Sequence, residues 1–582
     1  MFRILIVTLL ITSSISSQAV EKNTALNQLF AKEWQARMQQ FPSFASAMGD
    51  KNAAARLADV SETSMTKWLL KNENLLTGLK NISKSSLNRE EQINYRIFKR
   101  QLDNRIADLK AKDYQIPFLA DSGFHTQILR MPIETEFKTL GDYENYLKRL
   151  KLIRRFIEQN QANMNAGLKR HFSMPKIVMQ GFTQVIRAHL NKKVEDSVFY
   201  QPFLSRPSFI SESRFSNMQY AARRIISDSV LPAFRNLAIY FENIYIPNTK
   251  ISLGASDFPN GDNYYQQKIQ QYTTTHLTAK AIHQLGLSEV KRIRGEMQDI
   301  ITKVEFKGSF KEFLAFLRTS PQFYAKTPLQ LLKEASYIAK KMDGQLPKFF
   351  THLPRQPYTV EPVPSDIAPK YTTGRYVSAP LNSTRAGTYW VNTYALDKRP
   401  LYVLESLTLH EAVPGHHLQG AINQELSDLP NFRRYSYISA FGEGWALYCE
   451  KLGIEAGFYQ DPYSDFGRLS YEMWRAARLV IDTGIHAFGW SRQQAIALLQ
   501  ENSALSKHNI QTEVDRYISW PGQALSYKIG ELKIIELRNR AEQKLGDKFD
   551  IRTFHDAILA NGSIPLDILD SQINLYIEQQ LE

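Results

Sequence analysis

The chain has 582 residues, of which 43% are hydrophobic and 22% are charged, and its formal net charge is +14. This balance excludes disordered, collagen-like and fibrous proteins, because such a chain can bury one or more substantial cores. The Lys and Arg residues are spread along the sequence without a dense basic tract, so the charge does not predict nucleic-acid binding. The single cysteine, Cys449, excludes an intramolecular disulfide framework.

Residues 1–19 have the pattern of a secretory signal peptide. Arg3 precedes an apolar run, and the small residues Ser17 and Ala19 stand where a signal peptidase reads the chain. We predict cleavage near Ala19 and export to the periplasm or the exterior. No later stretch is long and apolar enough to predict a membrane span, and the oligomeric state stays open.

Residues 20–352 predict an N-terminal helical lobe. Apolar residues recur at a spacing of three to four in the segments 22–42, 63–80, 86–112, 142–167 and 215–246. The pattern continues through residues 265–303, where Thr278 and Ser288 are expected to cap helices and Gly286 to end one. We therefore expect a mainly α-helical chain, built as one large two-lobed body.

Residues 353–393 predict a Pro-rich connector that leads into a strand. Six prolines between Leu353 and Leu381 remove backbone donors and disfavour helix. The β-branched and aromatic run at residues 388–393 is typical of a strand. As an edge strand it could bind an extended peptide beside Tyr389, although a purely structural strand is equally consistent with the sequence.

Residues 394–582 carry the residues with recognisable chemistry. A helix predicted to begin at Pro400 contains His410 and Glu411. His416 and His417 follow closely, and three clustered histidines beside a carboxylate indicate a metal site.

The spacing departs from the usual His-Glu-x-x-His arrangement of zinc peptidases. The second histidine follows His410 by six or seven residues, and Pro414-Gly415 stands between them. Proline interrupts the hydrogen-bond ladder and glycine accepts unusual dihedral angles, so a local bulge is expected. We predict His416 as the second ligand and keep His417 in reserve.

A third ligand is expected downstream, because catalytic zinc takes three protein ligands and leaves one position open. Glu443 is the best candidate, since Gly442 and Gly444 would let its helix approach the first one closely. Glu450 would lie on the same helical face. It is expected either to orient a ligand histidine or to form an ordinary salt bridge.

A further predicted helix, over residues 466–488 and ended by Gly489, carries Arg478, Asp482 and His486 four residues apart. One interpretation is a chain of ion pairs within the helix. The other is that Arg478 or His486 faces a cleft and binds a substrate carboxylate.

Four motifs, HEAVPGHHLQ, FGEGWALYCE, RAARLVIDTGIHAFGW and PGQALSYKIG, resemble the bacterial family known as domain of unknown function 885. The resemblance runs from about residue 25 to the C-terminus. It implies a zincin-like (gluzincin) fold with a deep cleft, similar to thimet-type oligopeptidases, thermostable carboxypeptidases and angiotensin-converting enzyme. In these relatives a Gly-His pair supplies the second ligand and a later Glu the third, which supports His416 and Glu443.

The same relatives use tyrosine hydroxyls from a glycine-containing segment to stabilise the reacting carbonyl oxygen. The resemblance therefore implies Tyr527 for this role, with Tyr517 as the second choice.

Together these residues predict a peptidase with one Zn²⁺ ion, in which Glu411 is the general base for hydrolysis of a peptide. Two alternatives stay open: a zinc hydrolase of a non-peptide or cell-wall amide, and a non-catalytic binding protein whose metal geometry Pro414-Gly415 has disrupted. The mode of cleavage, from either end or internally, is not predicted.

Overall fold

The computed structural model describes residues 23–190, 193–365, 367–379 and 385–582. The predicted signal peptide lies outside these residues. The chain is mainly helical with one small sheet, which confirms the mainly α prediction. None of the described helices combines the length and the apolar character needed to cross a bilayer.

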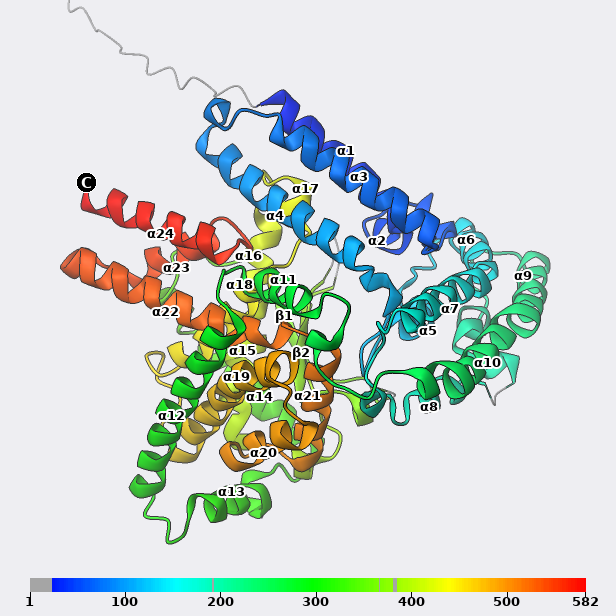
Figure 1. Cartoon of the computed structure of the whole chain (residues 1–582). Coiled ribbons are helices and arrows are strands. Elements are labelled where there is room, and N and C mark those ends of the chain that lie inside the picture. The colour runs from blue at the N-terminus through cyan, green and yellow to red at the C-terminus, as the bar shows by residue number, and fades with distance from the viewer. Residues whose placement is uncertain (1–22, 191–192, 366, 380–384) are drawn as a thin grey trace, which may run out of the picture.

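The first helices are amphipathic segments with polar N-terminal caps. Asn23, Ser61 and Asn88 each accept a hydrogen bond from the first turn of a helix. The helices are α1 (Thr24–Gln40), α2 (Pro42–Ala47), α3 (Glu62–Lys80) and α4 (Arg89–Ala111). Three of them confirm the predictions for residues 22–42, 63–80 and 86–112, and α1, α3 and α4 run side by side in Figure 1.

A second group of helices lies apart from the C-terminal helices in Figure 1. It contains α5 (Phe124–Glu134), α6 (Leu140–Lys151), α7 (Ile153–Lys169), α8 (Phe182–Arg187), α9 (Glu212–Ile225) and α10 (Leu231–Tyr240). The single helix predicted for residues 142–167 is two helices, which meet at Leu152. The helix predicted for residues 215–246 is present, with π-helical turns at Ile226–Val230 and Phe241–Tyr245.

The next helices are α11 (Gly261–Thr273), α12 (Ala279–Lys303), α13 (Phe310–Thr319) and α14 (Pro328–Asp343). Thr278 caps α12, as predicted. Gly286 does not end a helix but lies inside α12, and a Cβ there would be 2.8 Å from side-chain atoms of Leu479 and Val480. This glycine allows α12 to pack closely along α19 (Pro462–Phe488).

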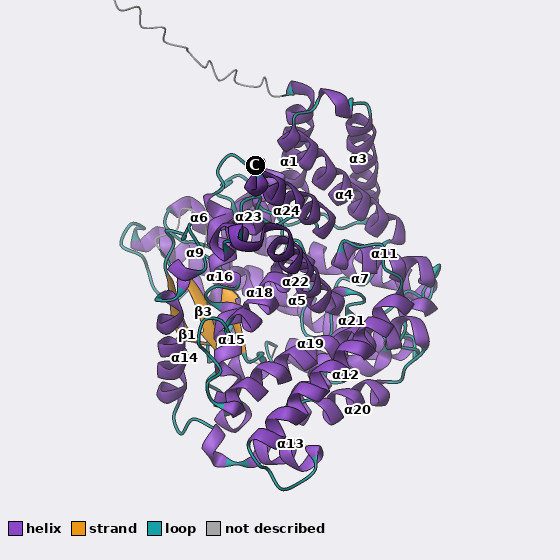
Figure 2. Ribbon diagram, turned by 90° about the vertical axis from the view of Figure 1, so that its left-hand side faces the viewer, coloured by secondary structure: helices purple, strands orange, loops and turns teal. Residues whose placement is uncertain are grey.

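Residues 353–393 contain all three strands of a small sheet, two of them in the Pro-rich part before the predicted strand. The strands are β1 (Tyr358–Pro362), β2 (Gly374–Val377) and β3 (Gly387–Val391), in the order β1-β3-β2. β3 pairs in parallel with β1 and antiparallel with β2. The prediction that residues 388–393 form an edge strand is therefore wrong, because β3 has a neighbour on each side. The sheet lies beside α14 and α15 (Leu404–Glu411) in Figure 2.

The remaining helices are α16 (His416–Glu425), α17 (Asn431–Arg434), α18 (Ser439–Leu452), α20 (Arg492–Asn502), α21 (Lys507–Ser519), α22 (Ser526–Leu545), α23 (Ile551–Leu559) and α24 (Leu566–Leu581). α18 packs against α22, and α19 packs against α12. This packing crosses the predicted boundary at residue 352, because α12 shares a core with the C-terminal helices.

Candidate metal centre

The helix that carries His410 stops completely before His416. α15 ends at Glu411 and α16 begins at His416, so the predicted bulge is instead a full break. A Cβ at Gly415 would lie 2.0 Å from the His410 carbonyl oxygen, so only glycine fits there. The Trp445 indole N–H donates to the Pro414 carbonyl at 2.9 Å, which ties the break to α18.

This break brings His410 and His416 together in front of Glu443. The distances from Glu443 Oε2 are 3.3 Å to His416 Nε2 and 3.7 Å to His410 Nε2, and the three ligand atoms lie within 4.8 Å of one another. Ligands placed tetrahedrally at ~2.0–2.1 Å from zinc are about 3.3 Å apart. In the described part of the chain, this is the one His, Cys, Asp and Glu group spaced for a metal ion.

One side of this cluster is partly exposed to solvent. The side chains of His416 and Glu443 are 16% and 14% exposed, whereas His410 is 4% exposed. Glu411, next to His410, is also partly exposed. A small molecule could therefore reach the cluster from the side of His416 and Glu411.

Glu450 contacts His410 on the side of the ring opposite to Glu443. The His410 Nδ1–H donates to Glu450 Oε1 at 2.8 Å, and Arg475 Nη2 lies 3.2 Å from the same oxygen. Burial would lower the pKa of His410, but its contacts with Glu443 and Glu450 raise it to about 10. Burial opposes ionisation of Glu443 too, yet His416 and His410 hold its pKa well below the usual value. The two carboxylates thus favour a positive charge at this position.

His417 points away from the cluster. Its Nδ1 lies 3.1 Å from the Tyr376 hydroxyl, and its ring packs on Tyr358 with the centroids 4.6 Å apart. Burial lowers its pKa to about 4. The structure brings His416 to the cluster and leaves His417 in the protein interior.

The β2 edge of the sheet faces Glu411. The backbone N–H of Tyr376, in edge strand β2, donates to Glu411 Oε2 at 2.8 Å. Tyr389, predicted to bind substrate, is fully buried on the central strand, and its hydroxyl lies 3.3 Å from the Thr408 hydroxyl. β2 therefore borders the candidate site, whereas Tyr389 is buried in the core and contacts α15, the helix that carries His410.

The glycines that flank Glu443 do not make room for the helix that carries His410, as predicted, but for other neighbours. A Cβ at Gly444 would lie 2.5 Å from the backbone of Gly530, so this residue permits close packing of α18 on α22. Gly530 stands one turn after Tyr527, and this crossing therefore brings the start of α22 near Glu443. A Cβ at Gly442 would lie 2.5 Å from the hydroxyl of Tyr437, so Gly442 makes room for that side chain.

Tyr437 is a site residue that the sequence reasoning missed. Burial and the nearby Glu443 carboxylate raise the pKa of its hydroxyl well above the usual value, and 55% of the residue is exposed, so Tyr437 lies at the more exposed side of the cluster. Tyr437 precedes α18 in an irregular segment, without a recognisable motif. Its only sequence signal is an aromatic residue six positions before the predicted ligand.

The two predicted tyrosines differ in their surroundings. Tyr517 is 1% exposed, and its hydroxyl accepts hydrogen bonds from Trp474 Nε1 at 2.8 Å and Arg478 Nε at 2.9 Å. Tyr527 is 9% exposed, and its hydroxyl lies 3.4 Å from Arg516 Nη2. Of the two, Tyr527 is the more exposed and its hydroxyl has fewer hydrogen bonds.

Arg478 is buried, contrary to the prediction that it faces a cleft. Its Nη2 donates to Glu513 at 3.0 Å, and its guanidinium packs on the rings of Trp474 and Tyr527. The alternative of ion pairs between Arg478, Asp482 and His486 along α19 is also wrong, because Arg478 pairs with Glu513 instead. The partner carboxylate comes from α21, because α19 is enclosed by other helices over most of its length.

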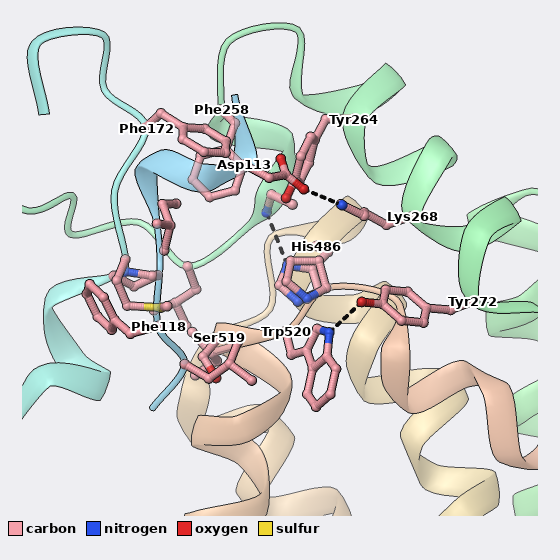
Figure 3. A pocket seen from close by; sticks show the side chains of 18 residues that line it. Asp113, Phe118, Phe172, Phe258, Tyr264, Lys268, Tyr272, His486, Ser519 and Trp520 are labelled. Carbon is pink, nitrogen blue, oxygen red and sulfur yellow. Dashed lines mark hydrogen bonds and ion pairs between the residues drawn. The ribbon is translucent and has the colours of Figure 1, made fainter. Parts of the chain in front are cut away.

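His486 lies at a different place, in the wall of a cavity of about 160 Å³ (Figure 3). Its Nδ1 accepts from the Ala255 N–H at 3.1 Å, and its Nε2–H donates to the Tyr517 carbonyl at 2.9 Å. Aromatic residues such as Phe172 and Trp520 line the same cavity, and no residue of the metal cluster does. His486 is therefore a buried structural histidine.

A mainly helical chain with a two-histidine, one-glutamate cluster and a glutamate beside it defines a candidate metalloprotein. The model of the family described as "Bacterial protein of unknown function (DUF885)" matches residues 42–573, and the chain belongs to this family. No curated protein matches the sequence.

Two solved structures share the fold. A protein described as a "putative lipoprotein" from Colwellia psychrerythraea is 27% identical, with a TM-score of 0.88 over 95% of this chain and 99% of that one. A second, of unknown function, from Shewanella oneidensis, is 19% identical, with a TM-score of 0.73 over 94% and 99% of the two chains. The second likeness concerns the fold alone.

Proposed function

We propose that this protein is a zinc-dependent peptidase that hydrolyses peptide bonds of oligopeptides. The observation that carries the proposal is the convergence of His410, His416 and Glu443, with Glu411 directly beside them on the partly exposed side. The proposal includes a zincin-like, two-lobed fold with a deep cleft.

The donor set is the main argument for zinc. Two imidazoles and one carboxylate are typical of catalytic zinc sites, which leave one position for water. The contact of Glu450 with His410 Nδ1 is the kind of partner that fixes ligand tautomer and orientation. His410, His416 and Glu443 would hold the ion.

When bound, zinc supplies a water of lowered pKa and polarises the substrate carbonyl. Beside such an ion, Glu411 would accept a proton from the attacking water and pass it to the leaving amine. Hydrogen bonding from the Tyr376 N–H keeps the Glu411 carboxylate oriented. Tyr437 and Tyr527 carry hydroxyls that can donate to the carbonyl oxygen as it gains negative charge.

Strand β2 offers a way to hold the peptide. Its outer edge is unpaired within the sheet and borders Glu411. An extended peptide could pair with this edge through backbone hydrogen bonds, which do not depend on side-chain identity. This arrangement favours a peptide over a cell-wall amide.

Export belongs to the same proposal. The solved relative from Colwellia psychrerythraea is described as a "putative lipoprotein", and lipoproteins are exported. The pattern of residues 1–19 agrees with that compartment. Mass determination of the mature N-terminus would test cleavage near Ala19.

The decisive experiment is anomalous scattering at the zinc edge, combined with cleavage assays. We expect one ion bound by His410, His416 and Glu443, and cleavage of a peptide library that a chelator abolishes and zinc restores. Cleavage of peptidoglycan fragments but not peptides would favour the cell-wall alternative. Absence of a bound ion after zinc loading would contradict the proposal.

A further inference from the structure

A pair of arginines with too few carboxylate partners lies next to Tyr527. Arg478 comes from α19 and Arg516 from α21, and both contact Glu513, at 3.0 Å and 3.4 Å respectively. Two guanidinium groups thus share one glutamate. The pair carries one positive charge in excess of this partner.

Asp482, a second carboxylate that interacts with Arg516, does not remove this excess completely. Asp482 interacts electrostatically with Arg516 but accepts its hydrogen bonds from the Tyr265 hydroxyl at 2.6 Å and the Gly522 N–H at 3.1 Å. Burial raises its pKa to about 7, so it is only partly ionised near neutral pH.

The guanidinium groups also retain unused donors. Nη1 of Arg478 is buried without a hydrogen-bond partner among the described residues, which is rare for such a group. Arg516 donates from Nη2 to Gln523 Oε1 at 2.6 Å, and its side chain is 20% exposed. Arg516 can therefore reach a ligand while Arg478, stacked on the ring of Tyr527, stays fixed behind it.

Tyr527 links this arginine pair to the candidate metal centre. Tyr527, which both arginines contact, lies one turn before Gly530. Gly530 in turn touches Gly444, the residue after Glu443. The start of α22 therefore connects Arg516 with the metal cluster, and a peptide that spans both would place its later residues at Arg516.

We infer that Arg516, supported by Arg478 and Tyr527, binds the free C-terminal carboxylate of a peptide, so that the substrates are short peptides cleaved near this end. A planar guanidinium group matches a carboxylate through paired hydrogen bonds. This inference rests on the proposed peptidase function for the cleavage step, but binding of the carboxylate can be tested separately.

The first test uses the unaltered protein and matched peptides. Zinc-loaded protein is given short peptides with a free C-terminus, and the same peptides with a C-terminal amide. We expect kcat/KM to be about 10- to 100-fold higher for the free acids, the range for a lost hydrogen bond to a charged group. An amidated peptide with a glutamate side chain shows whether any carboxylate suffices. Equal rates for acids and amides overturn the inference.

The second test measures binding without turnover. Glu411→Gln protein is titrated calorimetrically with an N-acetylated dipeptide acid and with its amide. Arg516→Gln should weaken the acid about 10- to 100-fold and leave the amide unchanged, and Arg516→Lys should restore part of the affinity. Arg492→Gln is the matched control, because Arg492 is 23% exposed and also pairs with a carboxylate of α21, Asp515.

The outcomes separate the two proposals. If the acid binds through Arg516 but no peptide is cleaved, the peptidase proposal fails and the carboxylate site stands. If peptides are cleaved without preference for the acid, the carboxylate site fails and the peptidase stands. Loss of acid binding in Arg492→Gln as well would also overturn the assignment to Arg516.

Discussion

Two buried histidines that lie beside or within helix α19 differ in their hydrogen-bond partners. His410 contacts Glu450, which Arg475 of α19 holds in turn, and its second nitrogen faces Glu443 and the neighbouring His416. His486, within α19, uses one nitrogen to accept from a backbone N–H and the other to donate to a backbone carbonyl. Burial is similar for both histidines, so burial does not distinguish a ligand from a structural residue.

The two histidines also differ in the charge that their surroundings favour. Carboxylates on both sides of His410 raise its pKa to about 10, whereas burial lowers the pKa of His486 to about 3. A histidine surrounded by carboxylates stabilises a positive charge, and a histidine held by backbone groups stays neutral. The first environment suits a cation, and the second suits packing.

The largest expected effect comes from removing a ligand. His416→Ala should abolish stoichiometric zinc binding and, with it, metal-dependent hydrolysis, because the cluster loses one of three donors. His417→Gln changes the adjacent histidine, which faces Tyr376, and His486→Gln changes the structural one. Both should retain zinc, as measured by elemental mass spectrometry of purified protein. Loss of zinc in His417→Gln would instead assign the second ligand to His417.

Glu411→Gln separates catalysis from metal binding. The substitution removes the proton acceptor but keeps the side-chain shape, so zinc content should be unchanged while kcat falls by about 10²- to 10⁴-fold. The measurement is steady-state hydrolysis of a peptide beside metal analysis of the same sample. An unchanged kcat would show that another group takes the proton.

Much of the fold was predictable because the apolar spacing of an amphipathic helix can be read within a short stretch of sequence. The N-terminal helices follow from apolar spacing and caps such as Ser61 and Asn88. Gly286 misled the prediction because a glycine that ends a helix and one that permits close packing look the same in sequence. Its partner, Val480, is nearly two hundred residues away.

The candidate site was predictable only where its residues form a motif. His410, His416 and Glu443 stand in recognisable segments, and the structure brings them together. Arg478 and Tyr389 could not be interpreted correctly, because their burial depends on Glu513 and on pairing with β1 and β2. The prolines of the connector hide the strand pattern of these two partners.

A smaller effect is expected from changing Glu450, the hydrogen-bond partner of the ligand His410. Glu450→Gln should weaken zinc affinity by about 10- to 100-fold, the range found when a partner of a metal-bound histidine is changed. The amide still reaches His410 but no longer carries the charge that stabilises it. Competition with a zinc-binding dye would measure the affinity. Glu455→Gln is a control, because Glu455 follows Glu450 closely in the sequence but pairs with Arg538 instead of a metal ligand.

The smallest effect for a single step is the dependence of zinc affinity on pH, counted per pH unit. In the metal-free protein, burial lowers the pKa of His410 but Glu443 and Glu450 raise it to about 10, so His410 is protonated at pH 7. Zinc needs the neutral ring and must displace this proton, so affinity should rise about tenfold per pH unit until the pH reaches the pKa. Calorimetry at pH 7 in buffers of different ionisation enthalpy should show about one proton released from His410. Glu443 contributes none, because its pKa is already well below the usual value. If zinc binding releases no proton at pH 7, Glu443 and Glu450 do not keep His410 protonated. His410 and His486 would then differ only in the position of their hydrogen-bond partners.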